Sequence, residues 1–136
     1  MQKRLHHLGW AVASIADSLP VWSELLGLPS LGFESFPGLD VQFFAAGECM
    51  IELLESRGGD VTVEAILQRN GGGLHHLAFG VPDVAAALKD CAKKGLELLD
   101  QVPRPGARGT MIGFIDPHWS DGTLVEFVQD PNWQFD

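Results

Sequence analysis

Residues 5–12 read Leu-His-His-Leu-Gly-Trp-Ala-Val, and residues 74–81 read Leu-His-His-Leu-Ala-Phe-Gly-Val. The two stretches match apolar residue for apolar residue, with the paired histidines in register, at an offset of 69 positions. Self-similarity of this kind is the signature of an internal repeat. The chain is therefore expected to build the same supersecondary unit twice.

The segments that follow the two stretches also correspond. Each is amphipathic, over residues 14–26 and 83–94, and each ends at a glycine typical of a helix C-terminus, Gly27 and Gly95. Pro20 falls about one turn into the first predicted helix, where its missing N–H is tolerated. Runs of strand-forming residues come next in both halves. These predicted strands cover residues 31–36, 41–46 and 49–55 in the first half, and 97–101, 110–115 and 123–129 in the second.

The order of elements predicts an α+β fold made of paired βαβββ modules with mostly antiparallel sheets. Module one covers residues 5–56 and module two covers residues 74–129. Between them, residues 60–70 have apolar side chains at helical spacing and predict a linker helix. A half of this length buries both faces of its own sheet poorly, so we expect residues 1–136 to form a single domain or to exchange with a second chain.

Charge and composition exclude several classes of function. Nine basic residues against eighteen acidic ones give a net charge of -9, which repels nucleic acid and anionic membranes. The sequence has no apolar run long enough for a membrane span or a signal peptide, so we expect a cytoplasmic protein. In a reduced compartment Cys49 and Cys91 are expected to be free, buried thiols.

Two glutamates occupy equivalent late positions in otherwise apolar strands, Glu52 in the first half and Glu126 in the second. A buried carboxylate is costly unless it is paired or coordinated, so both need a partner. Neighbouring residues of a strand point to opposite faces, and only one histidine of each pair therefore reaches a shared cavity. A divalent metal ion bound by His7, Glu52, His76 and Glu126 satisfies these conditions. This nitrogen and oxygen set suits zinc, cobalt, nickel, manganese or iron(II).

The remaining histidines have simpler interpretations. His6 and His75 are expected to be structural residues that hydrogen-bond on the other face of the sheet. His118 lies in a turn-rich stretch, residues 116–122, and is expected to be exposed.

In these respects the chain resembles the vicinal oxygen chelate superfamily, and within it most closely the methylmalonyl-CoA epimerase family. The resemblance spans nearly the whole chain. The motifs that carry it are HLGWAV at 7–12, LLGL at 25–28, IELLE at 51–55, GLHHLAF at 73–79, PRPGA at 103–107 and GTLVE at 122–126.

The resemblance implies a metal-dependent epimerase that acts on methylmalonyl-CoA or a similar 2-substituted acyl thioester by forming and reprotonating an enolate. Glu126 is one base by this resemblance. Epimerases often carry a second glutamate at the position that aligns with Gln42, and glutamine cannot take a proton. The resemblance implies that Glu52 stands where the ligand of some of those enzymes is glutamine, so Glu52 and Glu126 are predicted to be the two catalytic bases.

Further departures affect the substrate. His6, Arg108 and residues 116–119 differ from the usual epimerase pattern. Arg104, Arg108 and Gln42 are the candidates for substrate binding. The two arginines are favoured because Gly106 and Gly109, close to them in the sequence, let the backbone approach an anion closely.

Two other functions stay open. A glyoxalase I-type lactoylglutathione lyase uses the same kind of ligand set, and a non-enzymatic drug-binding resistance protein suits an acidic surface. Iron-dependent ring cleavage is disfavoured because it usually relies on a tyrosine and the chain has none. The apolar C-terminal residues Trp133 and Phe135 are expected to dock on the core or on a second subunit, and we expect a homodimer.

Overall fold

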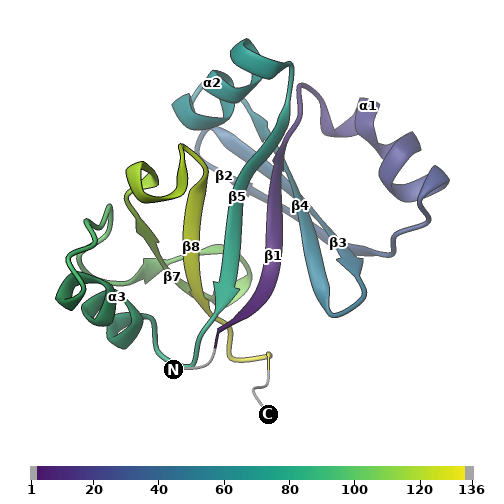
Figure 1. Cartoon of the computed structure of the whole chain (residues 1–136). Helices are drawn as coiled ribbons and strands as arrows, with labels where there is room; N and C mark the ends of the chain where they lie inside the picture. Colours follow the sequence, from purple (N-terminus) through teal and green to yellow (C-terminus); the bar gives the residue numbers. More distant parts are fainter. Residues whose placement is uncertain (1–2, 134–136) are drawn as a thin grey trace. The chain divides into compact units, whose positions relative to one another are not determined.

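The computed structural model describes residues 3–133. The chain divides into two compact units. The N-terminal unit is His7–His75, and the C-terminal unit contains the chain from His76 onward together with the residues that precede His7. Figure 1 shows that each unit combines strands with helices. The α+β class and the repeated module predicted from the sequence are confirmed.

In the N-terminal unit the strands run in the order β2-β3-β4-β1. Strands β2, β3 and β4 form antiparallel neighbours joined by tight turns, and β4 pairs in parallel with β1. Helix α1 follows β1, and α2 follows β4. The bounds are β1 Arg4–Ala11, α1 Ile15–Leu19, η1 Pro20–Leu25, β2 Ser30–Phe36, β3 Leu39–Ala46, β4 Cys49–Ser56 and α2 Val61–Asn70.

The C-terminal unit repeats this arrangement with the strand order β5-β8-β7-β6. Strand β8 pairs in parallel with β5 and antiparallel with β7, and β7 pairs antiparallel with β6. The pattern of directions is the same as in the N-terminal unit. The bounds are β5 Gly73–Gly80, α3 Val84–Lys93, β6 Arg104–Pro105, η2 Ala107–Gly109, β7 Met111–Ile115, η3 Pro117–Ser120 and β8 Leu124–Gln129.

The first helix differs from its prediction. The pattern predicts one continuous helix over residues 14–26, but α1 ends at Leu19 and a wider π-helix, η1, follows it. Pro20 begins η1 and has no backbone N–H to donate. In the wider turn the N–H of Leu26 donates to the carbonyl of Val21, five residues back, at 2.9 Å. The expected C-cap conformation is nevertheless present, because Gly27 has a positive φ of 66°.

The strand predicted over residues 97–101 is wrong. Only Leu98 forms an isolated bridge, to Ile115. The strand that pairs with β7 on the side away from β8 is the two-residue β6, further along the chain. The side chain of Asp100 accepts the N–H of Phe114 at 2.8 Å, and the N–H of Leu99 donates to the carbonyl of Phe114. The loop residues Leu99 and Asp100 therefore form the hydrogen bonds to the backbone of β7 where the sequence pattern predicts a strand.

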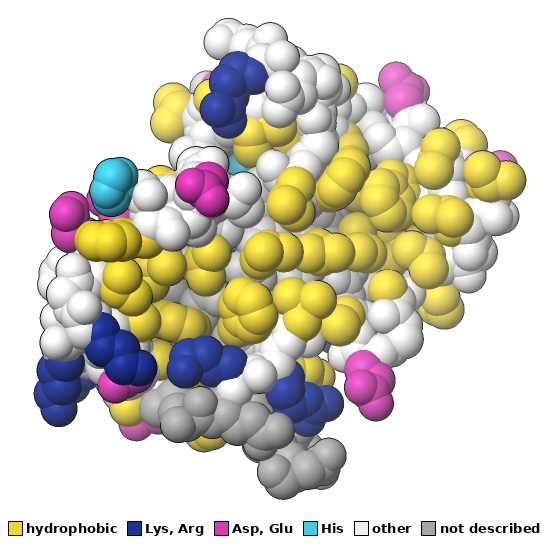
Figure 2. Space-filling view, in the orientation of Figure 1, with side chains coloured by type: hydrophobic (Ala, Val, Ile, Leu, Met, Phe, Trp, Pro, Cys, Tyr) yellow, Lys and Arg dark blue, Asp and Glu magenta, His cyan; other side chains and the backbone are white. Residues whose placement is uncertain are grey.

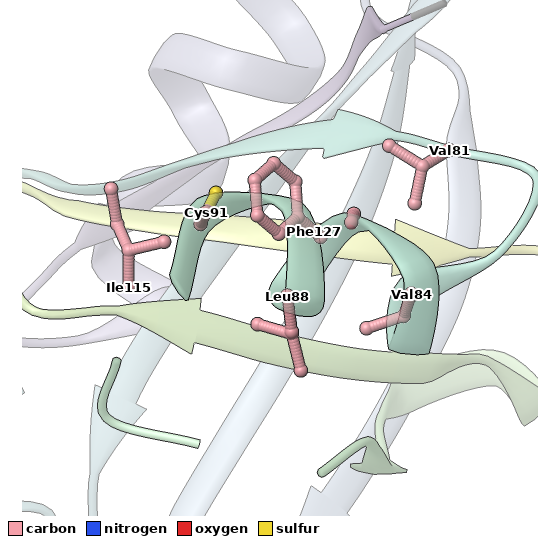
Figure 3. Packing of buried hydrophobic residues seen from close by; sticks show 7 residues of the cluster. Val81, Val84, Leu88, Cys91, Ile115 and Phe127 are labelled. Carbon is pink, nitrogen blue, oxygen red and sulfur yellow. The ribbon is translucent and has the colours of Figure 1, made fainter. Parts of the chain in front are cut away.

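A cluster of buried hydrophobic side chains lies between α3 and the strands of the C-terminal unit (Figure 3). The buried positions of α3 recur at helical spacing, at Val84, Ala87, Leu88 and Cys91. The helix packs closely on β7, since a Cβ placed on Gly113 would lie 2.9 Å from a methyl carbon of Leu88. A small residue at this strand position is therefore required for the packing.

The N-terminal unit has a corresponding cluster. Val12, Ile15, Phe44 and Leu53 are buried together, and Trp22 of η1 packs against them. Helix α1 begins at a Ser14 cap that accepts the N–H of Asp17, and the carboxylate of Glu55 accepts the N–H of Ile15 at 2.6 Å. These contacts fix α1 to the end of β4.

Both cysteines are free thiols, as predicted. Cys91 is buried in the α3 cluster, where burial raises the pKa of its thiol, and Cys49 is partly buried at the start of β4. A thiol with a raised pKa is less reactive. Among the described residues, no helix combines the length and apolar character needed to cross a bilayer.

The surface keeps some large apolar side chains. Figure 2 shows hydrophobic side chains at the surface of the face it presents. Over the described residues, the exposed large apolar side chains include Val21 and Leu25 of η1, Leu26 directly after it, and Phe33 of β2. Apolar surface of this kind is typical of contacts with other molecules, and the homodimer stays a prediction.

The packing of α3 gives a direct prediction for stability. Leu88→Ala removes a side chain that is 1% exposed and leaves a cavity under the helix, so it is expected to lower the free energy of unfolding by about 2–5 kcal/mol. Leu99→Ala is the matched control, because that side chain is 53% exposed and its loss should cost less than about 0.5 kcal/mol. Urea denaturation measures both, and equal losses would contradict the packing described.

Candidate functional site

The N-terminal unit presents a buried histidine and a buried glutamate on one sheet face. In the parallel pairing of β1 with β4, His7 lies opposite Met50 and Gly9 lies opposite Glu52. Paired residues share a face and side chains alternate along a strand, so His7 and Glu52 point to the same side. The His7 Nε2 and the Glu52 Oε2 are 3.2 Å apart, and both residues are more than nine-tenths buried.

The C-terminal unit contains the equivalent pair. In the parallel pairing of β5 with β8, His76 lies opposite Leu124 and Ala78 lies opposite Glu126. The relation between the two residues is the same as in the N-terminal unit. Their Nε2 and Oε2 atoms are 4.0 Å apart, and both side chains are buried. The structure therefore places the four predicted ligands as two pairs, one in each unit, at equivalent positions of the repeat.

The donor chemistry of these residues fits a divalent metal ion. His7, Glu52 and His76 each offer one imidazole nitrogen or carboxylate oxygen of the kind that ligates metals. Glu126 offers a second carboxylate of the same type. A buried carboxylate beside an imidazole nitrogen is the arrangement expected for residues that share a cation.

His6, the neighbour of His7, faces the other side of β1. Its Nε2 hydrogen-bonds to Oδ2 of Asp130 at 2.9 Å, and its ring meets the ring of Trp133 edge to face at 4.8 Å. The guanidinium of Arg4 lies 4.7 Å from the centre of the same indole. These contacts confirm that His6 is structural and that Trp133 docks on the core. Phe135 lies outside the described residues.

His75 has the corresponding structural role in the second repeat. Its Nε2 lies 2.7 Å from the hydroxyl oxygen of Thr62, at the start of α2. Burial lowers the pKa of His75, and the nearby carboxylate of Asp60 partly offsets that effect. The neutral imidazole is favoured as a result, and the contact attaches α2 to β5 within the N-terminal unit.

Asp60 caps α2 and completes this arrangement. Its carboxylate accepts the N–H groups of Thr62 and Val63 and the hydroxyl of Thr62. Burial alone would raise the pKa of Asp60, but these hydrogen bonds and the nearby His75 outweigh it and hold the pKa below its ordinary value of 3.8. The partners of His6 and His75 could not be found from the sequence pattern, because they come from other segments of the chain.

Gln42 does not share a face with the glutamate pair. It lies opposite Leu53, so it points away from the side that carries Glu52. Its amide donates to the hydroxyl of Ser30 and to the carbonyl of Gly32 at the end of the sheet. The contacts of Gln42 hold β2 against β3.

Glu34 occupies the face that Gln42 does not. It lies opposite Val41, which in turn lies opposite Leu54, two residues from Glu52 on β4. His7, Glu52 and Glu34 therefore project from one side of this sheet. Glu34 was not among the residues predicted for the site. Counting strand alternation back from Glu52 through the hairpin would have found it.

The other predicted residues lie in short elements of the C-terminal unit. Arg104 belongs to β6 and pairs with Asp100, whereas Arg108 is exposed in η2 with a left-handed φ of 57°. A non-glycine residue in this conformation carries backbone strain, which often marks a binding loop. His118 is exposed in η3, as predicted, and its ring packs against Trp119.

Comparison with known proteins identifies the family. A family model described as the Glyoxalase/Bleomycin resistance protein/Dioxygenase superfamily matches residues 6–114. The match covers well over half of the chain, so the chain belongs to this superfamily. The resemblance described from the motifs is therefore confirmed.

Individual relatives are more specific. An uncharacterized protein of Bacillus subtilis, YqjC, is 38% identical over 128 residues, which cover 93% of this chain and 91% of that protein. The mitochondrial methylmalonyl-CoA epimerase of Mus musculus is 32% identical over 129 residues, covering 93% of this chain and 72% of that protein. A solved methylmalonyl-CoA epimerase in complex with methylmalonyl-CoA and NH4+ has a TM-score of 0.91 at 28% identity, and the match covers 100% of both chains.

The Asp60 cap predicts a pH-dependent contribution to stability. Asp60→Ala should cost about 0.5–2 kcal/mol at pH 7, the usual loss for a helix cap. The pKa of Asp60 is lower in the folded chain than its ordinary 3.8, so this contribution is present above that pH and is lost as the pH falls through the folded value. Denaturation of wild type and variant at several pH values tests it.

Asp60→Asn is the matched control, since asparagine retains a capping oxygen but has no charge to titrate. It should lose less stability than Asp60→Ala at pH 7. Equal stability of the two variants, or a constant gap between wild type and alanine variant below pH 3.8, would contradict the role given to the carboxylate.

Proposed function

We propose that this protein is a metal-dependent epimerase of methylmalonyl-CoA or a similar 2-substituted acyl thioester. The observation that carries the proposal is the buried histidine and glutamate at the same register position in both units. Similarity to methylmalonyl-CoA epimerases, over nearly the full chain, supports an isomerase of this type.

We propose His7, Glu52, His76 and Glu126 as ligands of one divalent ion per chain, with the two units forming a single domain. The support for one shared ion is the repeat itself, because each unit supplies half of a four-ligand set. Such an ion, cobalt, zinc, nickel, manganese or iron(II), would act as a Lewis acid on the developing enolate.

The protein side of the reaction is proton transfer at C2 of the acyl group. One glutamate takes the C2 proton, the bonding pair becomes the enolate, and a carboxylic acid on the opposite side returns a proton to C2 with inversion. We propose Glu52 and Glu126 for these roles because each is a carboxylate on the equivalent face of its own unit. Each turnover exchanges the protonation states of the two residues, and the reverse reaction or solvent restores them.

Glu34 is a second carboxylate of the N-terminal unit. It projects from the same face as Glu52, on the outer strand β2. Unlike Gln42, it is able to accept and return a proton. The variant that distinguishes Glu52 from Glu34 therefore decides which residue serves as the base of this unit.

Proton exchange tests the function directly. The metal-loaded protein is incubated in deuterated water with methylmalonyl-CoA and, separately, with the methylglyoxal–glutathione adduct. An epimerase incorporates deuterium at C2 of methylmalonyl-CoA and leaves the adduct unchanged. Conversion of the adduct instead would establish the lyase function, and inertness toward both would favour a binding protein.

Metal content provides the first prediction for the site. His7→Ala and His76→Ala should each lower bound metal to less than about a tenth of the wild-type amount, because both units contribute ligands to one ion. Elemental analysis of the purified variants measures the change. His118→Ala is the control, since that histidine is exposed in η3. If each single variant kept about half of the metal, the two pairs would be independent sites.

Substitution of the candidate bases provides the second prediction. Glu52→Gln should lower the rate of inversion about 10²–10⁴-fold if Glu52 is the base, while the amide oxygen still ligates metal. Gln42→Ala should cost less than about tenfold, because its amide points to the other face. Separate assays of C2 exchange and of metal content separate proton transfer from ligation.

Glu34→Gln is the comparison that distinguishes the two carboxylates. A large loss in this variant with near-normal inversion in Glu52→Gln would move the base of the N-terminal unit from Glu52 to Glu34. A large loss of inversion rate in Gln42→Ala would contradict the strand register described.

A further inference from the structure

Equivalent positions of the two repeats carry opposite charges. In the N-terminal unit, Glu52 lies opposite Phe43 of β3. Glu34 lies opposite Val41, two residues before Phe43 on the same strand. In the C-terminal unit, Glu126 lies opposite Phe114 of β7. Arg104 lies opposite Ile112, two residues before Phe114 on the same strand. Arg104 therefore stands in relation to Glu126 as Glu34 stands in relation to Glu52.

Arg104 is directed along the face that carries His76 and Glu126. Its guanidinium carbon lies 5.4 Å from the centre of the Phe114 ring. The same ring meets the ring of His76 edge to face, with centres 6.2 Å apart. The Phe114 ring thus contacts both the arginine and the candidate metal ligand, and a guanidinium held over an aromatic ring has a restricted orientation.

Asp100 holds Arg104 in place. Its Oδ1 lies 2.9 Å from Nε of Arg104, and its Oδ2 accepts the N–H of Phe114 at 2.8 Å. The carboxylate is only 16% exposed, whereas the arginine side chain is 52% exposed. This pair uses Nε, and the two Nη groups carry four further N–H donors. The arrangement fixes the stem of the arginine while its donor end meets solvent.

We propose that Arg104 is a specificity-determining residue that binds an anionic oxygen group of the substrate, either the carboxylate of the acyl part or a phosphate of coenzyme A. The inference rests on the substrate class of the proposed function. A chain with a net charge of -9 repels an anionic substrate, so a fixed guanidinium on the face of the candidate site supplies the local attraction that binding requires. The planar guanidinium also matches a carboxylate or phosphate with two parallel hydrogen bonds.

Arg57 provides a matched control. It is 47% exposed and pairs with Asp40 at 3.0 Å, much as Arg104 pairs with Asp100. Asp40 lies opposite Glu55, so it shares the face of Gln42 rather than that of Glu52. Arg57→Gln removes the same charge and a similar ion pair without altering the face of the candidate site.

The experiment measures binding, so its outcome does not depend on turnover. Isothermal titration compares the wild type with Arg104→Gln, Arg104→Lys and Arg57→Gln for three ligands. Malonyl-CoA has both kinds of anionic group, acetyl-CoA has only the phosphates, and malonyl-N-acetylcysteamine has only the carboxylate. Deuterium exchange of methylmalonyl-CoA by the wild type is assayed separately, and its absence would count against the epimerase and not against Arg104.

Arg104→Gln should weaken malonyl-CoA binding by about tenfold or more, with a smaller loss for Arg104→Lys, which keeps the charge without the planar fork. A parallel loss for malonyl-N-acetylcysteamine alone identifies the carboxylate, and a parallel loss for acetyl-CoA alone identifies a phosphate. Affinities within about threefold of wild type for all ligands would overturn the proposal. The proposal also fails if Arg57→Gln weakens binding as much as Arg104→Gln does. It fails as well if acetyl-CoA and malonyl-N-acetylcysteamine both lose affinity in Arg104→Gln, or if the wild type binds none of the three ligands.

Discussion

Two glutamate carboxylates lie buried within apolar strands, and the fold of each unit is organised around holding them. An ionised carboxylate away from water is strongly destabilising unless a partner compensates it. Glu52 and Glu126 each have a histidine within 4.0 Å, on the strand that pairs in parallel with their own. A slip of one residue in either pairing would turn the glutamate to the opposite face and separate it from the histidine. The register of the sheet and the candidate site therefore depend on the same constraint.

Each doubled histidine places one ring on either side of its strand. His7 and His76 belong to the glutamate face, while their neighbours His6 and His75 are buried on the other side. His6 joins Asp130 and Trp133, and His75 joins Thr62 at the start of α2. Because neighbouring residues of a strand are rigidly linked, these contacts also limit the movement of the candidate ligands.

The two repeats diverge in the elements that surround the pair. The outer strand β2 has seven residues, whereas β6 has two, and the loop before β6 supplies Asp100 to orient Arg104. Equivalent positions consequently hold a carboxylate in one unit and a guanidinium in the other. The two repeats therefore share one architecture but present different side chains beside the histidine and glutamate pair.

The sequence by itself determined the repeat, the α+β modules, the free thiols and the four candidate ligands, because these depend on periodicity and on the cost of a buried charge. It did not reveal the π-helix at Pro20, the two-residue β6 or the partners of His6 and His75. Nor did it indicate which faces of the sheet carry Gln42 and Glu34. Those features depend on which backbone groups of distant segments satisfy one another, and on the register of hairpins that a pattern of apolar residues leaves open. Only the tertiary structure decided them, since a hydrogen bond such as that from Phe114 to Asp100 exists only once the chain has folded.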